Sequence, residues 1–171
     1  MLDGLRYRAA TPRDAMVVAQ LVATGFATYR EFAPPGWQPR TSFQEEGEVY
    51  DRLSRGDVHA RLALDGAMLA GVTGWMPALT PRPDHEPIPG RGHLWLLFVA
   101  PRWWGTGLAA ALLDWSVGTM RDCGKTTAQL WTPRDSGRAR AFYGREGWEP
   151  AGRGIFNPDL GLDLVMYERG L

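Results

Sequence analysis

The stretch from His93 to Leu113 limits the possible folds of this chain more than any other part of the sequence. An apolar run over residues 93–99 predicts a strand, and the run that begins near Leu108 predicts a helix. Between them stand Gly105 and Gly107, which let the backbone turn tightly and approach a ligand closely. Because the first N–H groups of a helix lack partners within the helix, this layout favours a bound anion. An ordinary strand-to-helix connection would show the same local pattern.

Length and composition narrow the class of protein. A chain of 171 residues has room for one domain with a real core, so we expect a single domain over residues 1–171. Basic and acidic residues each total 19, which gives no net charge to attract nucleic acid or a membrane. Cys123 is the only cysteine and the three histidines are scattered, so we expect neither a disulfide nor a metal site. The chain shows no signal segment and no membrane-length apolar run, which predicts a cytoplasmic protein.

Strand and helix patterns alternate along the chain. Polar–apolar alternation and apolar runs predict strands over 5–9, 59–64, 68–79, 93–99, 126–132, 148–153 and 162–169. Capping residues and helical spacing predict helices over residues 11–26, 41–56, 107–122 and 136–146. The second of these begins at Thr41 or Ser42 and ends at Gly56, and its apolar stripe is Phe43, Val49, Tyr50 and Leu53. The result is an α/β chain of about seven strands and four helices.

Two irregular segments interrupt this pattern. Three prolines and one glycine within residues 29–39 end the first helix and leave three aromatic residues on a loop, which either fills the core or lines a site. Residues 80–92 are rich in proline and too long for a simple turn, so we expect a loop. Such a loop either borders a site or decorates the surface.

Two segments carry the most specific patterns. One is Leu97-Phe98-Val99-Ala100-Pro101 followed by Trp104-Gly105-Thr106-Gly107-Leu108-Ala109 and Leu112-Leu113, and the other is Ser136 to Trp148 with Ala139, Phe142, Tyr143 and Gly147. In this order they resemble the strand and pyrophosphate loop, and the later helix, of the Gcn5-related N-acetyltransferase (GNAT) superfamily. The resemblance implies an α/β (α+β) fold with a mixed, mostly antiparallel central sheet that is splayed between its fourth and fifth strands.

The loop departs from the family pattern at one place. That pattern is arginine or glutamine, two residues, glycine, one residue, then glycine or alanine, and here Trp104 takes the first place before Gly107 and Ala109. A register that starts at Arg102 also fits, but the spacing from Val99 favours Trp104. Backbone N–H groups can hold a pyrophosphate without the basic side chain. Arg102 is a candidate for the missing charge.

The resemblance implies acetyl-coenzyme A as co-substrate, without a metal. The backbone of the fourth strand would pair with the pantetheine arm, the loop would hold the phosphates, and the later helix would complete the site. The implied coenzyme residues are Leu97, Phe98, Val99, Trp104, Gly105, Thr106, Gly107, Leu108, Ala109, Ser136, Ala139, Phe142 and Tyr143. The four arginines at 134, 138, 140 and 145 form either a solvated face or contacts to phosphate.

Two residues are candidates for proton transfer. Tyr143 matches the family tyrosine that donates a proton or hydrogen bond to the coenzyme sulfur, although a core tyrosine would fit the same apolar face. His93 stands about where some family members place a glutamate, so it is the first candidate for the general base, with a structural or exposed histidine as the alternative. His85, Glu86 and Glu31 are weaker candidates.

Aromatic residues on several segments suggest an acceptor pocket. We expect Tyr29, Phe32, Trp37, Trp75 and Trp95, together with the 80–92 loop, to form it, although each could instead pack in the core. The predicted function is transfer of acetyl from acetyl-coenzyme A to a primary amine of a small molecule in a ternary complex. A non-catalytic acyl-coenzyme A sensor, and acetylation of protein N-termini or lysines in an open groove, are the alternatives. The resemblance also allows a homodimer.

Overall fold

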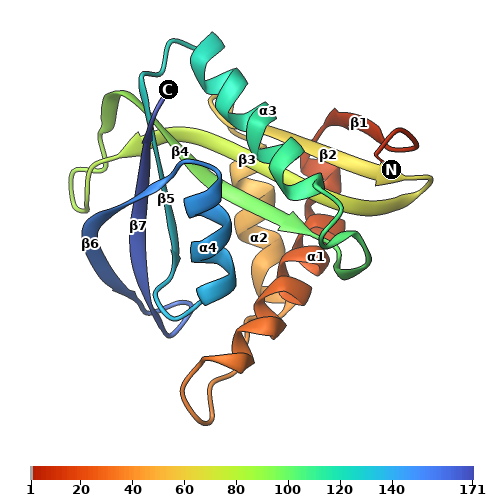
Figure 1. Ribbon diagram of the computed structural model, residues 1–171, viewed down its shortest axis with the longest axis horizontal. Helices are drawn as coiled ribbons and strands as arrows, with labels where there is room; N and C mark the ends of the chain where they lie inside the picture. Colours follow the sequence, from red (N-terminus) through yellow and green to blue (C-terminus); the bar gives the residue numbers. More distant parts are fainter. Residues whose placement is uncertain (1) are drawn as a thin grey trace.

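The protein folds around one seven-stranded sheet. A computed structural model describes residues 2–171, and its strands follow the order β1-β2-β3-β4-β5-β7-β6 (Figure 1). The strands are β1 (Arg6–Ala9), β2 (His59–Asp65), β3 (Met68–Leu79), β4 (Pro87–Val99), β5 (Thr127–Pro133), β6 (Glu149–Asn157) and β7 (Leu162–Gly170). The helices are α1 (Ala15–Ala27), α2 (Ser42–Leu53), α3 (Leu108–Asp122) and α4 (Gly137–Arg145), with 3-10 turns η1 (Pro12–Asp14), η2 (Thr28–Glu31) and η3 (Pro101–Trp103). The expected mixed sheet and four helices are confirmed.

The helices cover the two faces of the sheet. Helices α1 and α2 lie behind the sheet in Figure 1, where buried residues such as Val18 and Val49 pack on Leu62 and Val72 of β2 and β3. Helix α3 lies on the front face, where Leu113 and Met120 join residues of β3, β4 and β5 in a second cluster. Helix α4 is on this front face as well (Figure 1). No helix of the described residues is long and apolar enough to cross a membrane.

Local signals explain where the helices begin. Thr41 and Gln44 form a capping box at the start of α2, because each side chain bonds the backbone N–H of the other. Helix α4 begins after Ser136, whose Oγ accepts a hydrogen bond from the N–H of Ala139 at 3.4 Å. The expected apolar stripe of α2 is only partly correct. Val49 is buried, whereas Phe43 is 80% exposed.

The expected loop over residues 80–92 is wrong for its second half, because β4 already begins at Pro87. Gly92 pairs with Pro77 of β3, and Pro87 pairs with Leu79 beyond a register shift. Pro87 is tolerated at the start of β4 because β4 pairs with β5 only from Arg91 onward. The N–H that proline lacks is therefore not needed for a hydrogen bond to β5. The connection between β3 and β4 is therefore limited to residues 80–86.

Strands β4 and β5 pair over a short length and then separate. They are parallel, and the paired residues run only from Arg91 with Thr127 to Leu94 with Leu130. Strand β4 continues to Val99 against β3, while β5 continues to Pro133 against β7. The sheet is therefore splayed between its fourth and fifth strands, as the resemblance implied.

Candidate active site

A cavity of about 850 Å³ opens where β4 and β5 separate. Its walls come from α1, η2, α2, β4, β5 and α4, from the β6–β7 hairpin, and from the connections that carry Arg40 and Arg82. Leu97 and Phe98 on β4 line one side, and Ala139 and Tyr143 on α4 line the other. The cavity therefore brings together β4 and α4, the elements that carry the two most specific sequence patterns.

A β-bulge aims the side chains of β4 at this cavity. Gly74 of β3 pairs with Leu96, and its neighbour Trp75 pairs with Leu94, so Trp95 is an extra residue on β4. As a result Trp95 and Leu96 both pack toward the cluster under α1 and α2. Beyond Leu94 the β5 side of the β4 backbone has no strand partner among the described residues. Its polar groups can pair with an extended ligand there.

The loop before α3 leaves its backbone open. Gly105 and Gly107 have φ angles of +74° and +89°, and a Cβ placed on either residue would meet nothing within 4 Å. Gly107 is the left-handed residue directly before α3, so Leu108 and Ala109 occupy the first turn with N–H groups at the helix end. The N–H of Leu108 donates to the Oγ of Thr106, with 3.4 Å between the two heavy atoms, so this N–H already has a partner. This backbone matches the anion-binding layout expected from the sequence.

Trp104 lies at the edge of this loop. Its Nε1–H donates to the carbonyl of Val99 at 2.8 Å, and the guanidinium of Arg138 lies 3.7 Å from its ring centroid. Arg102, the expected source of positive charge, instead pairs with Asp65 at 3.1 Å. The charge nearest to Trp104 therefore comes from α4.

Tyr143 lies on the cavity side of α4. Its ring packs against Phe142, Trp148 and Tyr167, with centroids 5.2, 6.2 and 6.3 Å away. Phe142 is not among the described residues that line the cavity. Burial raises the pKa of the Tyr143 phenol, so the phenol keeps its proton at neutral pH. A protonated phenol is the form that can donate to a leaving thiolate.

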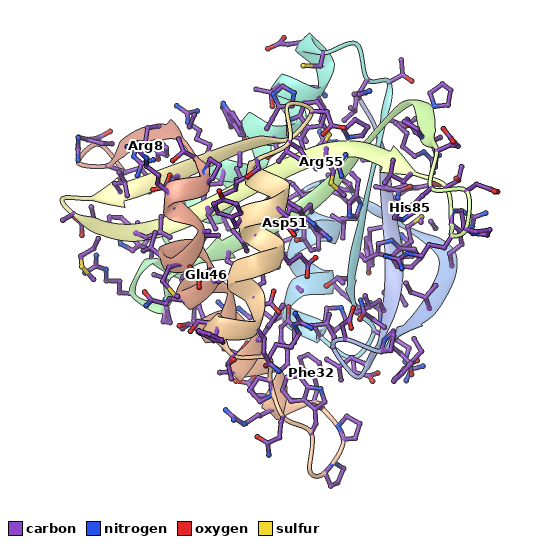
Figure 2. All side chains as sticks on the ribbon, turned by 180° about the vertical axis from the view of Figure 1, so that it is seen from behind. Arg8, Phe32, Glu46, Asp51, Arg55 and His85 are labelled. Atoms are coloured by element: carbon purple, nitrogen blue, oxygen red, sulfur yellow. The ribbon has the colours of Figure 1, made fainter. Side chains whose placement is uncertain are left out.

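His93 also lines the cavity, at the start of the splay. Burial and the positive charge of Arg52 lower its pKa to about 4, and a hydrogen bond with the backbone of Gln129 opposes this shift. Its Nδ1 is buried without a hydrogen-bond partner among the described residues. The imidazole is thus neutral at pH 7. The weaker candidates His85, Glu86 and Glu31 are exposed and lie outside the cavity lining, and Figure 2 shows His85 near the β3–β4 connection.

The expected acceptor residues divide into three groups. Tyr29 and Trp95 line the cavity. Phe32 and Trp37 lie next to Tyr29, with ring centroids 5.3 and 6.4 Å from it, and Figure 2 shows Phe32 beyond the end of α1. Trp75 lies outside the cavity lining. It is 1% exposed in the core, stacks on His59 and donates its Nε1–H to Thr119 at 2.7 Å.

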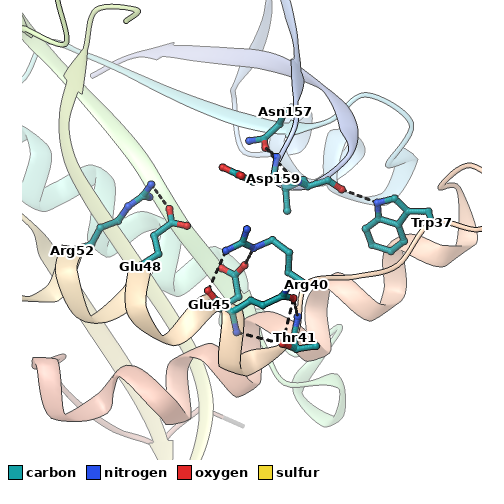
Figure 3. A network of polar contacts seen from close by, with 10 residues as sticks. Trp37, Arg40, Thr41, Glu45, Glu48, Arg52, Asn157 and Asp159 are labelled. Carbon is teal, nitrogen blue, oxygen red and sulfur yellow. Dashed lines mark hydrogen bonds and ion pairs between the residues drawn. The ribbon is translucent and has the colours of Figure 1, made fainter. Parts of the chain in front are cut away.

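A polar network along α2 and the segment just before it lines the cavity, and the sequence patterns did not single it out (Figure 3). Arg40 bonds Glu45, and Arg52 bonds Glu48 one turn further along the helix. The Arg52 guanidinium lies 5.1 Å from the centroid of the Trp95 ring, and burial lowers its pKa. The spacing of Glu48 and Arg52 was visible in the sequence, but such pairs are usual on solvated helix faces. Only the packing of α2 against the splayed sheet turns this face inward.

One hydrogen bond joins two distant segments beside the cavity. The indole of Trp37 donates to the carbonyl of Leu160 at 2.7 Å, as Figure 3 shows. Trp37 lies in the connection between η2 and α2, and Leu160 lies in the β6–β7 hairpin. Asp159 of the same hairpin lies near Arg40 in Figure 3. Burial opposes the charge of the Arg40 guanidinium, but its bond to Glu45 and, more weakly, the charges of Glu48 and Asp159 raise its pKa. The two segments therefore close one side of the cavity.

Comparison with known proteins matches this architecture. The family model of the acetyltransferase (GNAT) family matches residues 25–148. No curated protein matches the chain. Among solved structures, a GNAT-family protein from Desulfovibrio desulfuricans is 25% identical, with a TM-score of 0.71 over 97% of this chain and 98% of that one.

Two further structures share the fold at lower identity. The PaiA N-acetyltransferase of Thermoplasma acidophilum, in complex with coenzyme A, is 15% identical, with a TM-score of 0.68 over 98% of this chain and 99% of that one. The ribosomal-protein-S18-alanine N-acetyltransferase of Escherichia coli is 14% identical, with a TM-score of 0.66 over 97% and 93% of the two chains. The family match covers most of the chain and includes both the pyrophosphate-loop segment and the α4 segment. The chain therefore belongs to the acetyltransferase (GNAT) family.

Proposed function

We propose that the protein transfers the acetyl group of acetyl-coenzyme A directly to a primary amine of a small molecule, within a ternary complex. The observation that carries this proposal is the cavity at the splay, which places Tyr143 and His93 beside the free backbone edge of β4. A protein that only sensed acyl-coenzyme A would need the free edge but not the two proton-transfer groups.

The described residues fit acetyl-coenzyme A, which supplies a thioester when it binds. The open backbone of Gly105 and Gly107 and the first turn of α3 suit its pyrophosphate. The unpaired side of β4 beyond Leu94 suits the amide groups of its pantetheine arm. An N–H of this strand, aimed at the thioester oxygen, would stabilise the negative charge that develops there during attack.

Two side chains of the cavity would move protons. Tyr143 donates from its phenol to the departing sulfur, and its raised pKa keeps the proton in place until then. His93 accepts the proton of the attacking amine, directly or through water, because its imidazole is neutral at pH 7. Its lowered pKa makes it a weak base, so the neutral form persists down to about pH 4.

The closed side of the cavity favours a small acceptor. A peptide that crosses the site needs a continuous groove, and the bridge from Trp37 to Leu160 interrupts the space between the η2–α2 connection and the β6–β7 hairpin. The remaining walls combine the aromatic rings of Tyr29 and Trp95 with paired charges on α2. An amine with an apolar or aromatic body suits these walls.

Release of free coenzyme A thiol across a panel of arylalkylamines, alkylamines, aminoglycosides and peptides tests this function. We expect thiol release with small amines that carry an apolar or aromatic group, and mass spectrometry should find one added acetyl group on the product. Acetyl-coenzyme A binding without thiol release from any amine would favour the sensor instead. Turnover confined to peptides would overturn the small-molecule acceptor.

Tyr143→Phe tests the proposed acid. Because only the phenol oxygen is lost, kcat should fall roughly 100-fold while the Kd for acetyl-coenzyme A stays within about twofold. The matched control is Tyr50→Phe, which removes the same atom from a side chain that is 53% exposed on α2. Unchanged turnover in Tyr143→Phe would remove this residue from the mechanism.

A further inference from the structure

Arg138 lies over the ring of Trp104, beside the glycine loop that precedes α3. Its guanidinium is 3.7 Å from the ring centroid, which is close contact for a cation over an aromatic face. Arg138 belongs to the first turn of α4, whereas Trp104 lies just before the glycine loop that leads into α3. This contact therefore joins two elements that approach each other from opposite sides of the splay.

Trp104 holds its ring in place without Arg138. The indole N–H donates to the carbonyl of Val99 at 2.8 Å, which ties the ring to the last residue of β4. The side chain is still 39% exposed, so its face forms a platform at the surface. A guanidinium that stacks on such a platform uses its flat face and keeps its N–H groups at the edges free for an anion.

Arg138 differs in this respect from the arginines near it. Arg102 pairs with Asp65 at 3.1 Å, and Arg134 pairs with Asp163 at 2.9 Å. Arg140 donates to the hydroxyl of Tyr167 at 3.1 Å. Within residues 2–171, the Arg138 side chain has no ion pair and no hydrogen bond, and its guanidinium lies over the Trp104 ring. Its guanidinium is therefore held in place by the Trp104 ring, and its N–H groups are free to bind an anion.

We infer that Arg138, held on Trp104, binds the pyrophosphate of the coenzyme from the side of α4, opposite the backbone N–H groups of the glycine loop. This inference rests on the proposed coenzyme site. In the family pattern a basic loop residue supplies the positive charge at this place. Here Trp104 takes that position and holds the guanidinium of Arg138, which comes from α4. The bound phosphate then links α3 and α4, and so links the two halves of the splayed sheet.

Calorimetric titration with coenzyme A, 3′-dephospho-coenzyme A and phosphate-free pantetheine tests the assignment. Arg138→Ala should weaken both phosphate-bearing ligands about tenfold and leave pantetheine unchanged, because only a charge-assisted bond to the pyrophosphate is lost. The dependence of the Kd on NaCl should also become less steep. Arg145→Ala is the matched control, since it removes the same charge from an exposed position on the same helix.

Two further variants separate the role of the ring from that of the charge. Trp104→Leu should weaken coenzyme A in the same direction, because Arg138 loses its platform. Trp104→Arg in the Arg138→Ala background should recover most of the lost affinity, because it puts a cation back at the loop. Equal melting temperatures would show that the variants are folded.

Unchanged affinity for coenzyme A in Arg138→Ala would overturn the inference while leaving the proposed function intact. A loss for coenzyme A but not for 3′-dephospho-coenzyme A would overturn it as well, because the contact would then be to the 3′-phosphate. If the wild-type protein bound no coenzyme A, the proposed function itself would fail.

Discussion

His93 shows how its surroundings determine what a side chain can do. From the sequence it was a candidate general base at the start of a strand, with a structural or exposed histidine as the alternative. In the structure burial and the Arg52 guanidinium disfavour a positive charge on the imidazole, and the pKa falls to about 4. The residue is therefore held neutral throughout the physiological pH range.

This lowered pKa predicts a loss of stability in mild acid. Between pH 6.5 and about 4 the unfolded chain binds a proton at His93 that the folded protein does not bind, so the free energy of unfolding should fall as the pH falls through this range. The contribution reaches about 3 kcal/mol at most. Urea unfolding from pH 4.5 to 7.5 measures it.

The variant His93→Gln should flatten this part of the pH dependence. His85→Gln is the control, because that side chain is exposed at the β3–β4 connection and its removal should leave the wild-type slope. An unaltered slope in His93→Gln would show that another group is responsible for the acid sensitivity.

Local sequence patterns predicted the roles of only some residues in and around the site. Ser136, and Thr41 or its neighbour Ser42, were recognisable as helix caps because capping depends on neighbours within three positions, and the structure shows that Thr41 is the cap. Trp75 was expected at the pocket, but its indole found a partner in Thr119, 44 residues away. A contact of that kind depends on how α3 packs on β3, and no local pattern reveals it.

The continuous apolar run of β4 gives no sign in the sequence of which side chains face which side of the sheet. Alternation normally tells which residues face which side of a sheet, but residues 94–99 are all apolar and give no such signal. The extra residue at Trp95 was therefore invisible in the sequence, although it sets which side chains reach the cavity. The strand was predicted over residues 93–99, but neither its start at Pro87 nor its bulge was predicted.

Helix α1 approaches β4 closely at a glycine. A Cβ on Gly25 would overlap the ring of Phe98, a residue that lines the cavity. Gly25→Ala should lower the free energy of unfolding by about 1–3 kcal/mol, since the overlap outweighs the gain of about 1 kcal/mol in helix propensity. The displaced ring should also weaken coenzyme A binding. Thermal unfolding and calorimetric titration measure the two effects.

Gly118→Ala in α3 is the control, because its Cβ would meet nothing within 4 Å. This variant should gain roughly 0.5–1 kcal/mol from helix propensity alone. Equal stabilisation in both variants would show that Phe98 can move aside without cost.

The cavity as a whole is built from segments that are far apart in the sequence. Trp37 and Leu160 are 123 positions apart and meet in one hydrogen bond. The order of strands and helices could be predicted because it follows local patterns. The inward face of α2, with Glu45 and Arg52, could not, because its polar residues also suit a helix exposed to water.

Trp37→Phe tests the closure of the cavity. Phenylalanine keeps a ring beside Tyr29 but cannot donate to Leu160, so the bridge should loosen by about 1 kcal/mol. We expect the KM for the small amine to rise severalfold while the Kd for coenzyme A stays constant. Steady-state kinetics with the best amine of the panel measures the first, and titration provides the internal control. A KM equal to that of the wild type would show that the bridge does not shape the acceptor site.

The short parallel pairing between β4 and β5 also has a mechanical meaning. Only the register from Arg91 to Leu94 joins the strands on the two sides of the splay, whereas β3 and β4 pair along nearly their whole length. If a force pulled strands β1–β4 away from strands β5–β7, the sheet would separate first between β4 and β5. An extended ligand bound in the gap would add backbone hydrogen bonds to β4. It would therefore stabilise the sheet mechanically as well as take part in the reaction.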